Sequence, residues 1–160
     1  MTTTATLRRP AFLFYLGLAV TALVTVAPLV DLFTVDSIAG HVRDAYPAWP
    51  AGSVAADRNA IAIYLAAVGV LGMAGWLWAI VLHVRGSRRT RLISTVLFVV
   101  GAVIALTDLS VGGESYDRIV PLSYGLAGLL PVLIGAVAVV ELWRGRQNHY
   151  SRSRVEVDQR

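Results

Sequence analysis

Four long apolar stretches constrain the fold of this chain more than any other feature. Each has about the 18 or more residues that an α-helix needs to cross the hydrocarbon core of a bilayer. A chain of 160 residues that is 56% hydrophobic and 15% charged is too small to bury so much apolar surface in a water-soluble core. We therefore expect an all-α protein, a membrane-embedded antiparallel four-helix bundle. The expected spans are residues 11–30, 60–82, 92–109 and 119–142.

The distribution of arginine predicts the orientation of these spans, because positive charge stays on the cytoplasmic side during insertion. All fourteen basic residues are arginine. With four spans, eleven lie on one side, and only Arg43, Arg58 and Arg118 lie on the other. The third span is the weakest because Asp108 interrupts it, and the arginine distribution is the main reason to retain it. Both termini are then expected in the cytoplasm, in a bacterial cytoplasmic (inner) membrane.

The spans divide the chain into three parts. Residues 1–10 are expected to form a cytoplasmic N-terminal tail, and residues 11–143 the transmembrane domain, with an outer loop at 31–59. Residues 144–160 are polar and basic, so we expect a disordered cytoplasmic tail there. A secretory signal is the alternative interpretation of the first span, but its apolar run is longer than a typical signal core.

The outer loop contains a further helical pattern. Apolar residues recur at helical spacing from Leu32 to Val42, which predicts a short helix that either extends the first span or lies on the membrane surface. Two prolines within residues 46–50 would end it, and Ser53 is expected to cap the second long helix. Aromatic residues expected to anchor the spans at headgroup level are Trp76, Trp78 and Trp143 at cytoplasmic ends and Tyr64 and Tyr124 at outer ends.

Small residues at helical spacing mark the faces through which the spans are expected to pack. Helices in lipid associate by close backbone approach and polar contacts, so glycine and threonine gather on packing faces. Each span has such a face, and Pro131 is expected to kink the fourth span. The expected packing residues are Gly17, Thr21, Thr25, Gly69, Gly72, Gly75, Gly101, Gly128 and Gly135.

Four charged residues at the outer span ends project onto these packing faces, at about 100° per residue. They are Asp31, Arg58, Asp108 and Asp117. If the helices continue that far, these residues converge on the outer mouth of the bundle. Three interpretations remain open: a structural ion-pair cluster, ordinary solvated loop ends, and a substrate or ion site.

Several chemistries lack the residues that they need. The chain has no cysteine, which removes thiolate metal sites and cysteine nucleophiles. No histidine pair inside the spans could hold haem, and no serine has a histidine placed as its base. His41 lies near Asp36 and Asp44, but their spacing is not that of a metal-ligand set. The arginines flank apolar segments, which argues against nucleic acid. We therefore expect no enzymatic activity, no cofactor and no metal.

As a whole, the chain resembles the uncharacterised four-helix membrane proteins that are common in GC-rich bacterial genomes. They have a similar long first outer loop and an arginine-rich middle link, and the resemblance implies a fold and a location without a catalytic motif. In size and helix count the chain is also similar to the small multidrug exporters. Those exporters carry a glutamate in the middle of the first helix, whereas this first span has no acid before Asp31.

These observations favour a non-enzymatic accessory or scaffold protein in the lipid bilayer. Its expected partner is another membrane protein, or a second copy of itself in a homo-oligomer. The alternative is a small oligomeric transporter or channel subunit with an acidic site at its outer mouth, formed by Asp31 and Asp108.

Overall fold

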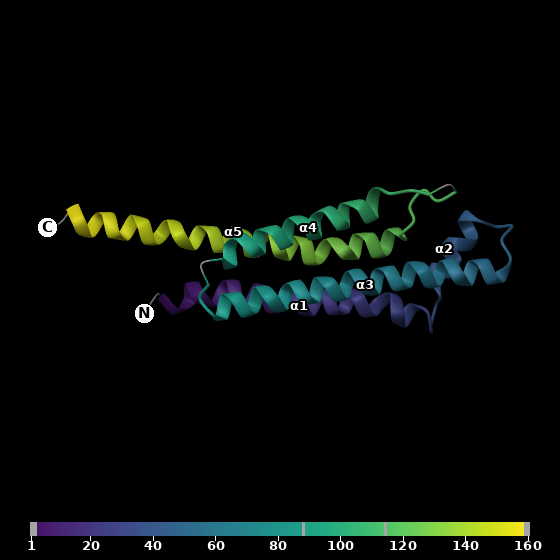
Figure 1. Ribbon diagram of the computed structural model, residues 1–160, viewed down its shortest axis with the longest axis horizontal. Coiled ribbons are helices and arrows are strands. Elements are labelled where there is room, and N and C mark those ends of the chain that lie inside the picture. The colour runs from purple at the N-terminus through teal and green to yellow at the C-terminus, as the bar shows by residue number, and fades with distance from the viewer. Residues whose placement is uncertain (1–2, 88, 114, 159–160) are drawn as a thin grey trace.

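The protein is all-helical over the residues that the structure describes. The computed structural model describes the backbone of residues 3–158 except 88 and 114, and the side chains of residues 11–144 with the same exceptions. This part of the chain contains five helices and no strand (Figure 1). The helices are α1 (Thr3–Asp31), α2 (Ser37–Ala45), α3 (Ala51–Val84), α4 (Thr90–Ser110) and α5 (Leu122–Asp158).

Four of these helices, α1, α3, α4 and α5, are long and apolar enough to cross a membrane. The expected third span, which was the weakest, is a continuous helix of 21 residues that includes Asp108. Consecutive long helices run in opposite directions (Figure 1). One end of the molecule carries α2 and the loop between α4 and α5, and we call it the α2 end. The opposite end carries the short arginine-rich link between α3 and α4.

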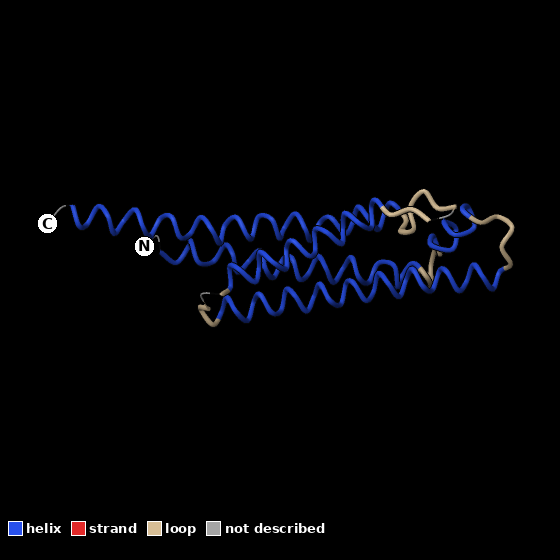
Figure 2. The backbone as a smooth tube through the Cα atoms, turned by 45° about the horizontal axis from the view of Figure 1, so that its top comes forward, coloured by secondary structure: helices blue, strands red, loops and turns tan. Residues whose placement is uncertain are grey.

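The four long helices lie side by side over most of their length (Figure 2). Among the described residues, α1 contacts both α3 and α5, and α4 contacts α5 and, over a shorter seam, α3. The short helix α2 packs against α3 and touches α1. α1 therefore connects α3 to α5, and α4 is attached mainly through α5.

α3 starts earlier than expected. We expected a second span at 60–82 and Ser53 as the cap of its helix, but the helix begins at Ala51 and Pro50 occupies the N-cap position with φ −65°. Proline pre-sets this φ and brings no N–H group that would stay unpaired, so it suits a helix start. α3 has 34 residues, a length of about 51 Å, which exceeds the hydrocarbon core by about 20 Å.

α5 also differs from its expected bounds. It begins after Pro121 and continues to Asp158, whereas we expected disorder over 144–160. Extending an existing helix requires no new nucleation, and after Gly145 the chain contains neither glycine nor proline to interrupt it. Pro131, which we expected to kink the span, lies within the helix.

α1 and α3 pack through residues that we predicted for this purpose. Thr25 of α1 lies against Gly69 of α3, where a Cβ would overlap the threonine side chain, and Thr21 Cγ2 would lie 3.2 Å from a Cβ on Gly72. Both threonine hydroxyls donate to carbonyl oxygens one turn earlier, Thr21 to Gly17 at 2.7 Å and Thr25 to Thr21 at 2.6 Å. The hydroxyls are therefore satisfied within α1, and the glycines let the two backbones approach closely.

Trp76 fills the space that two glycines leave. We expected it to anchor α3 at headgroup level, and this is wrong, because its half-buried ring lies between α1 and α5. A Cβ on Gly17 of α1 would overlap the ring, and a Cβ on Gly135 of α5 would lie 3.8 Å from it. The indole Nε1 donates to Thr21 Oγ1 at 2.9 Å, and the Phe14 ring centroid is 6.2 Å from that of Trp76. The indole N–H therefore has a partner in an otherwise apolar environment.

Two further predicted glycines pack against α4. A Cβ on Gly75 of α3 would lie 3.5 Å from Leu97, and a Cβ on Gly135 of α5 would lie 3.4 Å from Phe98. Both distances correspond to ordinary contact, so these glycines bring α4 close without a forced overlap.

Two predicted glycines do not pack closely. No described heavy atom lies within 4 Å of the position that a Cβ would take at Gly101 or Gly128. The prediction also missed Gly125, where a Cβ would lie 2.8 Å from Leu109. The α4–α5 contact therefore uses Gly125, one turn before the predicted Gly128, in addition to the predicted Gly135.

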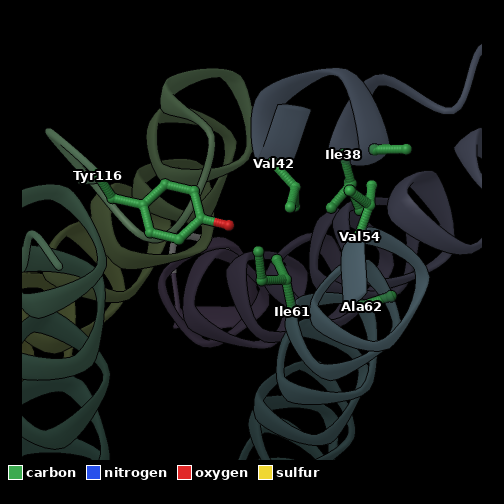
Figure 3. Close-up of a cluster of buried hydrophobic side chains, with 7 residues drawn as sticks. Ile38, Val42, Val54, Ile61, Ala62 and Tyr116 are labelled. Atoms are coloured by element: carbon green, nitrogen blue, oxygen red, sulfur yellow. The ribbon is translucent and has the colours of Figure 1, made fainter. Parts of the chain in front are cut away.

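A hydrophobic core at the α2 end joins α2 to the first turns of α3. Ile38 and Val42, one turn apart on α2, are fully buried in a cluster with Val54 and Ile61 of α3 (Figure 3). Tyr116, from the loop between α4 and α5, completes this core. The apolar side of α2 therefore faces α3, whereas we expected this helix to extend the first span or to lie on the membrane surface.

Candidate functional site: polar contacts at the α2 end

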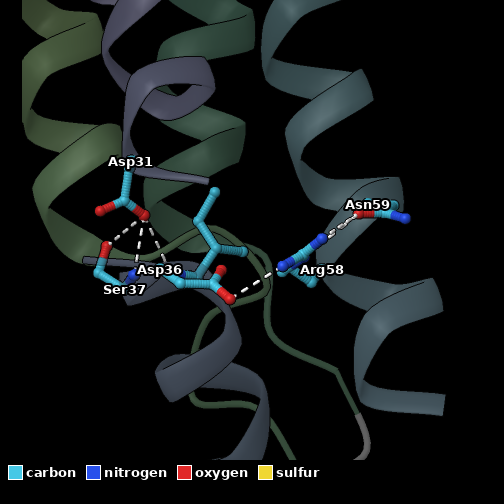
Figure 4. Close-up of polar contacts among 6 residues, drawn as sticks. Asp31, Asp36, Ser37, Arg58 and Asn59 are labelled. Atoms are coloured by element: carbon cyan, nitrogen blue, oxygen red, sulfur yellow. Dashed lines mark hydrogen bonds and ion pairs between the residues drawn. The ribbon is translucent and has the colours of Figure 1, made fainter. Parts of the chain in front are cut away.

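Asp31, the last residue of α1, caps the next helix. Its Oδ2 accepts hydrogen bonds from the Ser37 backbone N–H at 2.8 Å, the Ser37 hydroxyl at 2.9 Å and the Ile38 N–H at 3.4 Å (Figure 4). A carboxylate is favoured here because the first N–H groups of a helix are unpaired and the helix dipole is positive at this end. Asp36, at the N-cap position itself, has a left-handed backbone with φ 54°. Asp31 therefore caps the N-terminus of α2 from the other side of the turn.

Arg58 pairs with Asp36, a residue that we had not placed in the cluster. Its Nη1 lies 2.8 Å from Asp36 Oδ2, and its Nε and Nη2 donate to Asn59 Oδ1 at 3.2 and 3.0 Å (Figure 4). The Asp36 N–H donates to the Asp31 carbonyl oxygen at 2.8 Å. Asp31 and Arg58 are therefore connected through Asp36, and the ion pair holds the turn after α1 against α3.

Asp108 takes part in a different contact. The Tyr64 hydroxyl of α3 donates to Asp108 Oδ1 of α4 at 2.6 Å. Both residues belong to helices that are long and apolar enough to cross a membrane. A carboxylate in an apolar helix of this kind is costly in a membrane unless it has a partner. The tyrosine hydroxyl supplies that partner and joins α4 to α3.

Asp117 lies in the loop between α4 and α5, and its side chain is exposed. Its expected position assumed that the fourth helix continues back to this residue, but α5 begins at Leu122. Pro121 disfavours helix in the residue before it. Of the four predicted charges, the structure thus connects Asp31 with Arg58 and leaves Asp108 and Asp117 outside those contacts.

The loop between α4 and α5 is fastened to α2 and α3 by a set of contacts that we call the Tyr116 clasp: Tyr116, Asp57, His41 and Arg118. The Tyr116 hydroxyl donates to Asp57 Oδ2 of α3, and its ring stacks on His41 of α2 with centroids 5.2 Å apart. His41 Nε2 donates to the Arg118 carbonyl oxygen at 2.9 Å. Burial of the phenol and its hydrogen bond to Asp57 raise the pKa of Tyr116 above its ordinary value of 10.

The connection between α2 and α3 is held by aromatic rings. Tyr46 and Trp49 stack with centroids 3.9 Å apart and an interplanar angle of 11°. The edge of Tyr46 also contacts Tyr116, at a centroid distance of 5.1 Å. Trp49 remains 38% exposed. The α2 end therefore presents the partly exposed ring of Trp49, which is held by stacking on Tyr46.

Sequence reasoning missed the partners Asp36, Asp57 and Tyr116. Asp57 was noticeable only as an acid in the first turns of a helix, and Asp36 only as a loop acid. Tyr116 carried one usable signal, because an aromatic side chain in a short polar loop between two spans needs an apolar place to pack. Nothing in its local sequence indicates that this place lies on α2 and α3.

The contacts at the α2 end position segments of the chain relative to one another. Each of the carboxylates of Asp31, Asp36, Asp57 and Asp108 accepts a hydrogen bond or ion pair from a protein donor. These contacts hold helices and loops together. A catalytic site, in comparison, needs a nucleophile and a base that face one reacting atom. Compared with known proteins, the chain matches no protein-family model, no curated protein and no solved structure.

Proposed function

We propose that this chain is a multi-pass four-helix bundle of a bacterial cytoplasmic membrane, with both termini in the cytoplasm and the α2 end outside. We further propose that it is a non-enzymatic accessory or scaffold protein that binds another membrane protein through the α2 end. The arginine distribution supports the orientation. The observation that carries the binding role is the ordered extension of α3 beyond the length of a span.

This extension has its own packed core. α3 exceeds a span by about 20 Å, and α2 covers the extra turns by packing Ile38 and Val42 against Val54 of α3. The Tyr116 clasp and the Asp36–Arg58 ion pair add contacts between segments that are far apart in the chain. Ordering a loop when a partner binds costs conformational entropy. A surface that is already fixed before binding avoids most of this cost, so the α2 end is suited to binding a partner.

Trp49 is the residue that we expect at the centre of the contact with the partner. It is partly exposed and held flat against Tyr46. Tryptophan and tyrosine are enriched among the residues that contribute most to protein–protein binding, because they bury a large area with few rotatable bonds.

Site-specific photo-cross-linking in native membranes tests this role. A photoreactive amino acid in place of Trp49 should give one discrete adduct with a membrane protein, and the same group at Val100 should give adducts with lipid only. Val100 is the matched control because it is a half-exposed apolar residue on α4, away from the α2 end. Adducts that are the same at both positions would contradict the binding role.

The orientation has a separate test. The chain contains no cysteine, so a single cysteine at Ser87, in the link between α3 and α4, or at Ser115, in the loop between α4 and α5, can be labelled without background. A membrane-impermeant thiol reagent added to intact cells should label position 115 and not position 87. Labelling of both positions from the same side would show that the chain does not cross the membrane between them.

A small transporter or channel subunit is the second candidate, and the Tyr64–Asp108 contact is the observation that favours it. This carboxylate lies in a helix long enough to span, with an oxygen at 2.6 Å from a hydroxyl of the neighbouring helix. Reconstitution into vesicles would detect ion or substrate flux that disappears in Asp108→Asn and persists in Asp31→Asn, because Asp31 caps α2. Absence of flux together with a co-purifying partner favours the accessory role.

A further inference from the structure

The turn between α1 and α2 exposes two large apolar side chains. Phe33 is 89% exposed and Val35 is 80% exposed, which are the highest values among the large hydrophobic residues described. The neighbouring Leu32 instead packs against the core at the α2 end. The turn thus separates one apolar side chain that faces the protein from two that face away from it.

Most backbone N–H groups of this turn are paired by local hydrogen bonds. The Phe33 N–H donates to the Val30 carbonyl oxygen at 3.1 Å, and the N–H groups of Thr34 and Asp36 donate to that of Asp31 at 3.1 and 2.8 Å. The Thr34 hydroxyl also donates to the Val30 carbonyl oxygen, at 3.0 Å. Unpaired backbone groups are what normally keep a turn out of an apolar medium. Here the N–H groups of residues 32–34 are paired, whereas the carbonyl oxygens of residues 32–35 accept no hydrogen bond from the described residues, so the backbone of the turn suits the headgroup level, where water reaches it.

The carboxylates on either side of the turn, Asp31 and Asp36, both have partners within the protein. Asp31 accepts the N–H groups of α2, and Asp36 is paired with Arg58. Between these two acids, residues 32–35 contain no ionisable side chain. The turn is therefore an apolar projection between two carboxylates, of which Asp31 is hydrogen-bonded to α2 and Asp36 is paired with Arg58.

The position of the turn determines what covers it. It directly follows the span of α1, whose last residues Leu29 and Val30 are exposed apolar side chains of the same kind. In Figure 1 the turn projects sideways from the end of α1, while Ser37 after it lies beside Tyr124 of α5, with the two hydroxyl oxygens 3.4 Å apart. The exposed apolar surface of α1 therefore continues onto Phe33 and Val35, beside the bilayer.

We propose that residues 32–35 form a wedge that inserts Phe33 and Val35 into the outer leaflet of the bilayer, between the lipid headgroups and the acyl chains. This inference rests on the proposed membrane embedding. Burial of these side chains in lipid removes apolar surface from water, and the Asp31 and Asp36–Arg58 contacts hold the turn at a fixed height. The wedge thereby fixes the depth and the tilt of α1, and with it the height of the surface that carries Trp49.

Collision measurements with a nitroxide label test the wedge in the full chain. The protein is reconstituted into vesicles of phosphatidylcholine and phosphatidylglycerol with a single labelled cysteine at Phe33, Leu29 or Ser53. Oxygen concentrates in the hydrocarbon, whereas a charged nickel complex stays in water, so the ratio of the two collision rates reports depth. Leu29 is the reference for lipid, and Ser53, an exposed residue in the first turn of α3, is the reference for water.

A label at Phe33 should give a ratio close to that at Leu29 and several times that at Ser53. A ratio at Phe33 equal to that at Ser53, with Leu29 still in lipid, overturns the wedge and leaves the membrane embedding intact. A water-like ratio at Leu29 overturns both. Dipolar broadening at Phe33 that is lost on dilution with unlabelled protein would assign this surface to a second copy and also overturn the wedge. A label at Val35 repeats the measurement in case the change at Phe33 disturbs the turn.

Discussion

Alanine at Gly69 and alanine at Gly101 are the same chemical change inside two long helices, but the structure predicts different outcomes. At Gly69 of α3 a Cβ would overlap the side chain of Thr25 on α1. At Gly101 of α4 no described heavy atom lies within 4 Å of the new Cβ. The pair therefore measures the close approach of α1 and α3 with a control that differs only in its surroundings.

The expected magnitude follows from two terms. Alanine is favoured over glycine in a helix by about 0.8–1.0 kcal/mol at both positions, so this term cancels in the difference. The second term is the overlap at Gly69, where Thr25 is 6% exposed and its hydroxyl is bonded to the Thr21 carbonyl oxygen at 2.6 Å. Thr25 cannot rotate away without losing that bond, and overpacking typically costs about 1–3 kcal/mol. Gly69→Ala should therefore be less stable than Gly101→Ala by about 1–3 kcal/mol.

Reversible unfolding in mixed micelles with increasing dodecyl sulfate, followed by tryptophan fluorescence, gives both free energies. Thr25→Ala in the Gly69→Ala protein should recover part of the loss, because it removes Oγ1 and Cγ2, the two atoms that the new Cβ would overlap most, and keeps only the Thr25 Cβ. Equal stability of the two single variants, or no recovery in the double variant, would refute the close approach of α1 and α3 at Gly69.

Three further predictions concern the α2 end, and amide hydrogen exchange of α2 and the adjacent loop measures all of them. Asp31→Ala should speed exchange in α2 by removing its cap, a loss of about 0.5–2 kcal/mol, and Asp31→Asn should do less because it keeps an acceptor. Tyr116→Phe should weaken the clasp by about 1–3 kcal/mol, because the Asp57 carboxylate loses its donor. The pKa of Tyr116 is raised when the clasp is closed, so the contribution of its hydrogen bond to the stability of the clasp is complete below pH 10. This contribution falls as the pH rises above 10, because Tyr116 ionises first in the open form of the loop.

Each of these predictions has an outcome that would contradict it. Unchanged exchange in α2 after Asp31→Ala would show that Asp31 is not its cap. Equal hydrogen exchange of the loop in Tyr116→Phe and in the unchanged protein would show that the Tyr116 hydroxyl does not stabilise the clasp. Loss of protection above pH 10 that persists in Tyr116→Phe would assign the pH dependence to another group.

The long helices and part of one interface could be predicted from the sequence. Hydropathy and helical periodicity are local properties, and they place three apolar stretches within α1, α3 and α4 and the fourth on α5, except for its first three residues, 119–121. The spacing of Thr21 and Thr25, and of Gly69 and Gly72, also identified the faces that meet between α1 and α3. Small residues let helices approach closely, but the same spacing also selected Gly101 and Gly128, which do not pack closely, so spacing alone did not identify every interface.

Only the tertiary structure decided which charged groups meet. Projection onto ideal helices placed Asp117 on the fourth helix, but that helix begins at Leu122. Arg58 pairs with Asp36. Asp36 has a left-handed backbone in the turn after α1, which no helical periodicity predicts. The partner of a charged side chain depends on the path of the loops and on where helices end.

The structure contains the four helices of membrane-spanning length that the sequence predicts, and it adds what lies between and beyond them. Sequence alone determined that the chain has four membrane-length helices, because a rise of about 1.5 Å per residue and the thickness of the bilayer fix that length. The tertiary structure decided that Trp76 lies between Gly17 and Gly135, that Gly101 packs against nothing described, and that Tyr116 closes the α2 end. These facts depend on the rotation of each helix about its axis and on contacts between residues far apart in the chain, which local patterns do not encode.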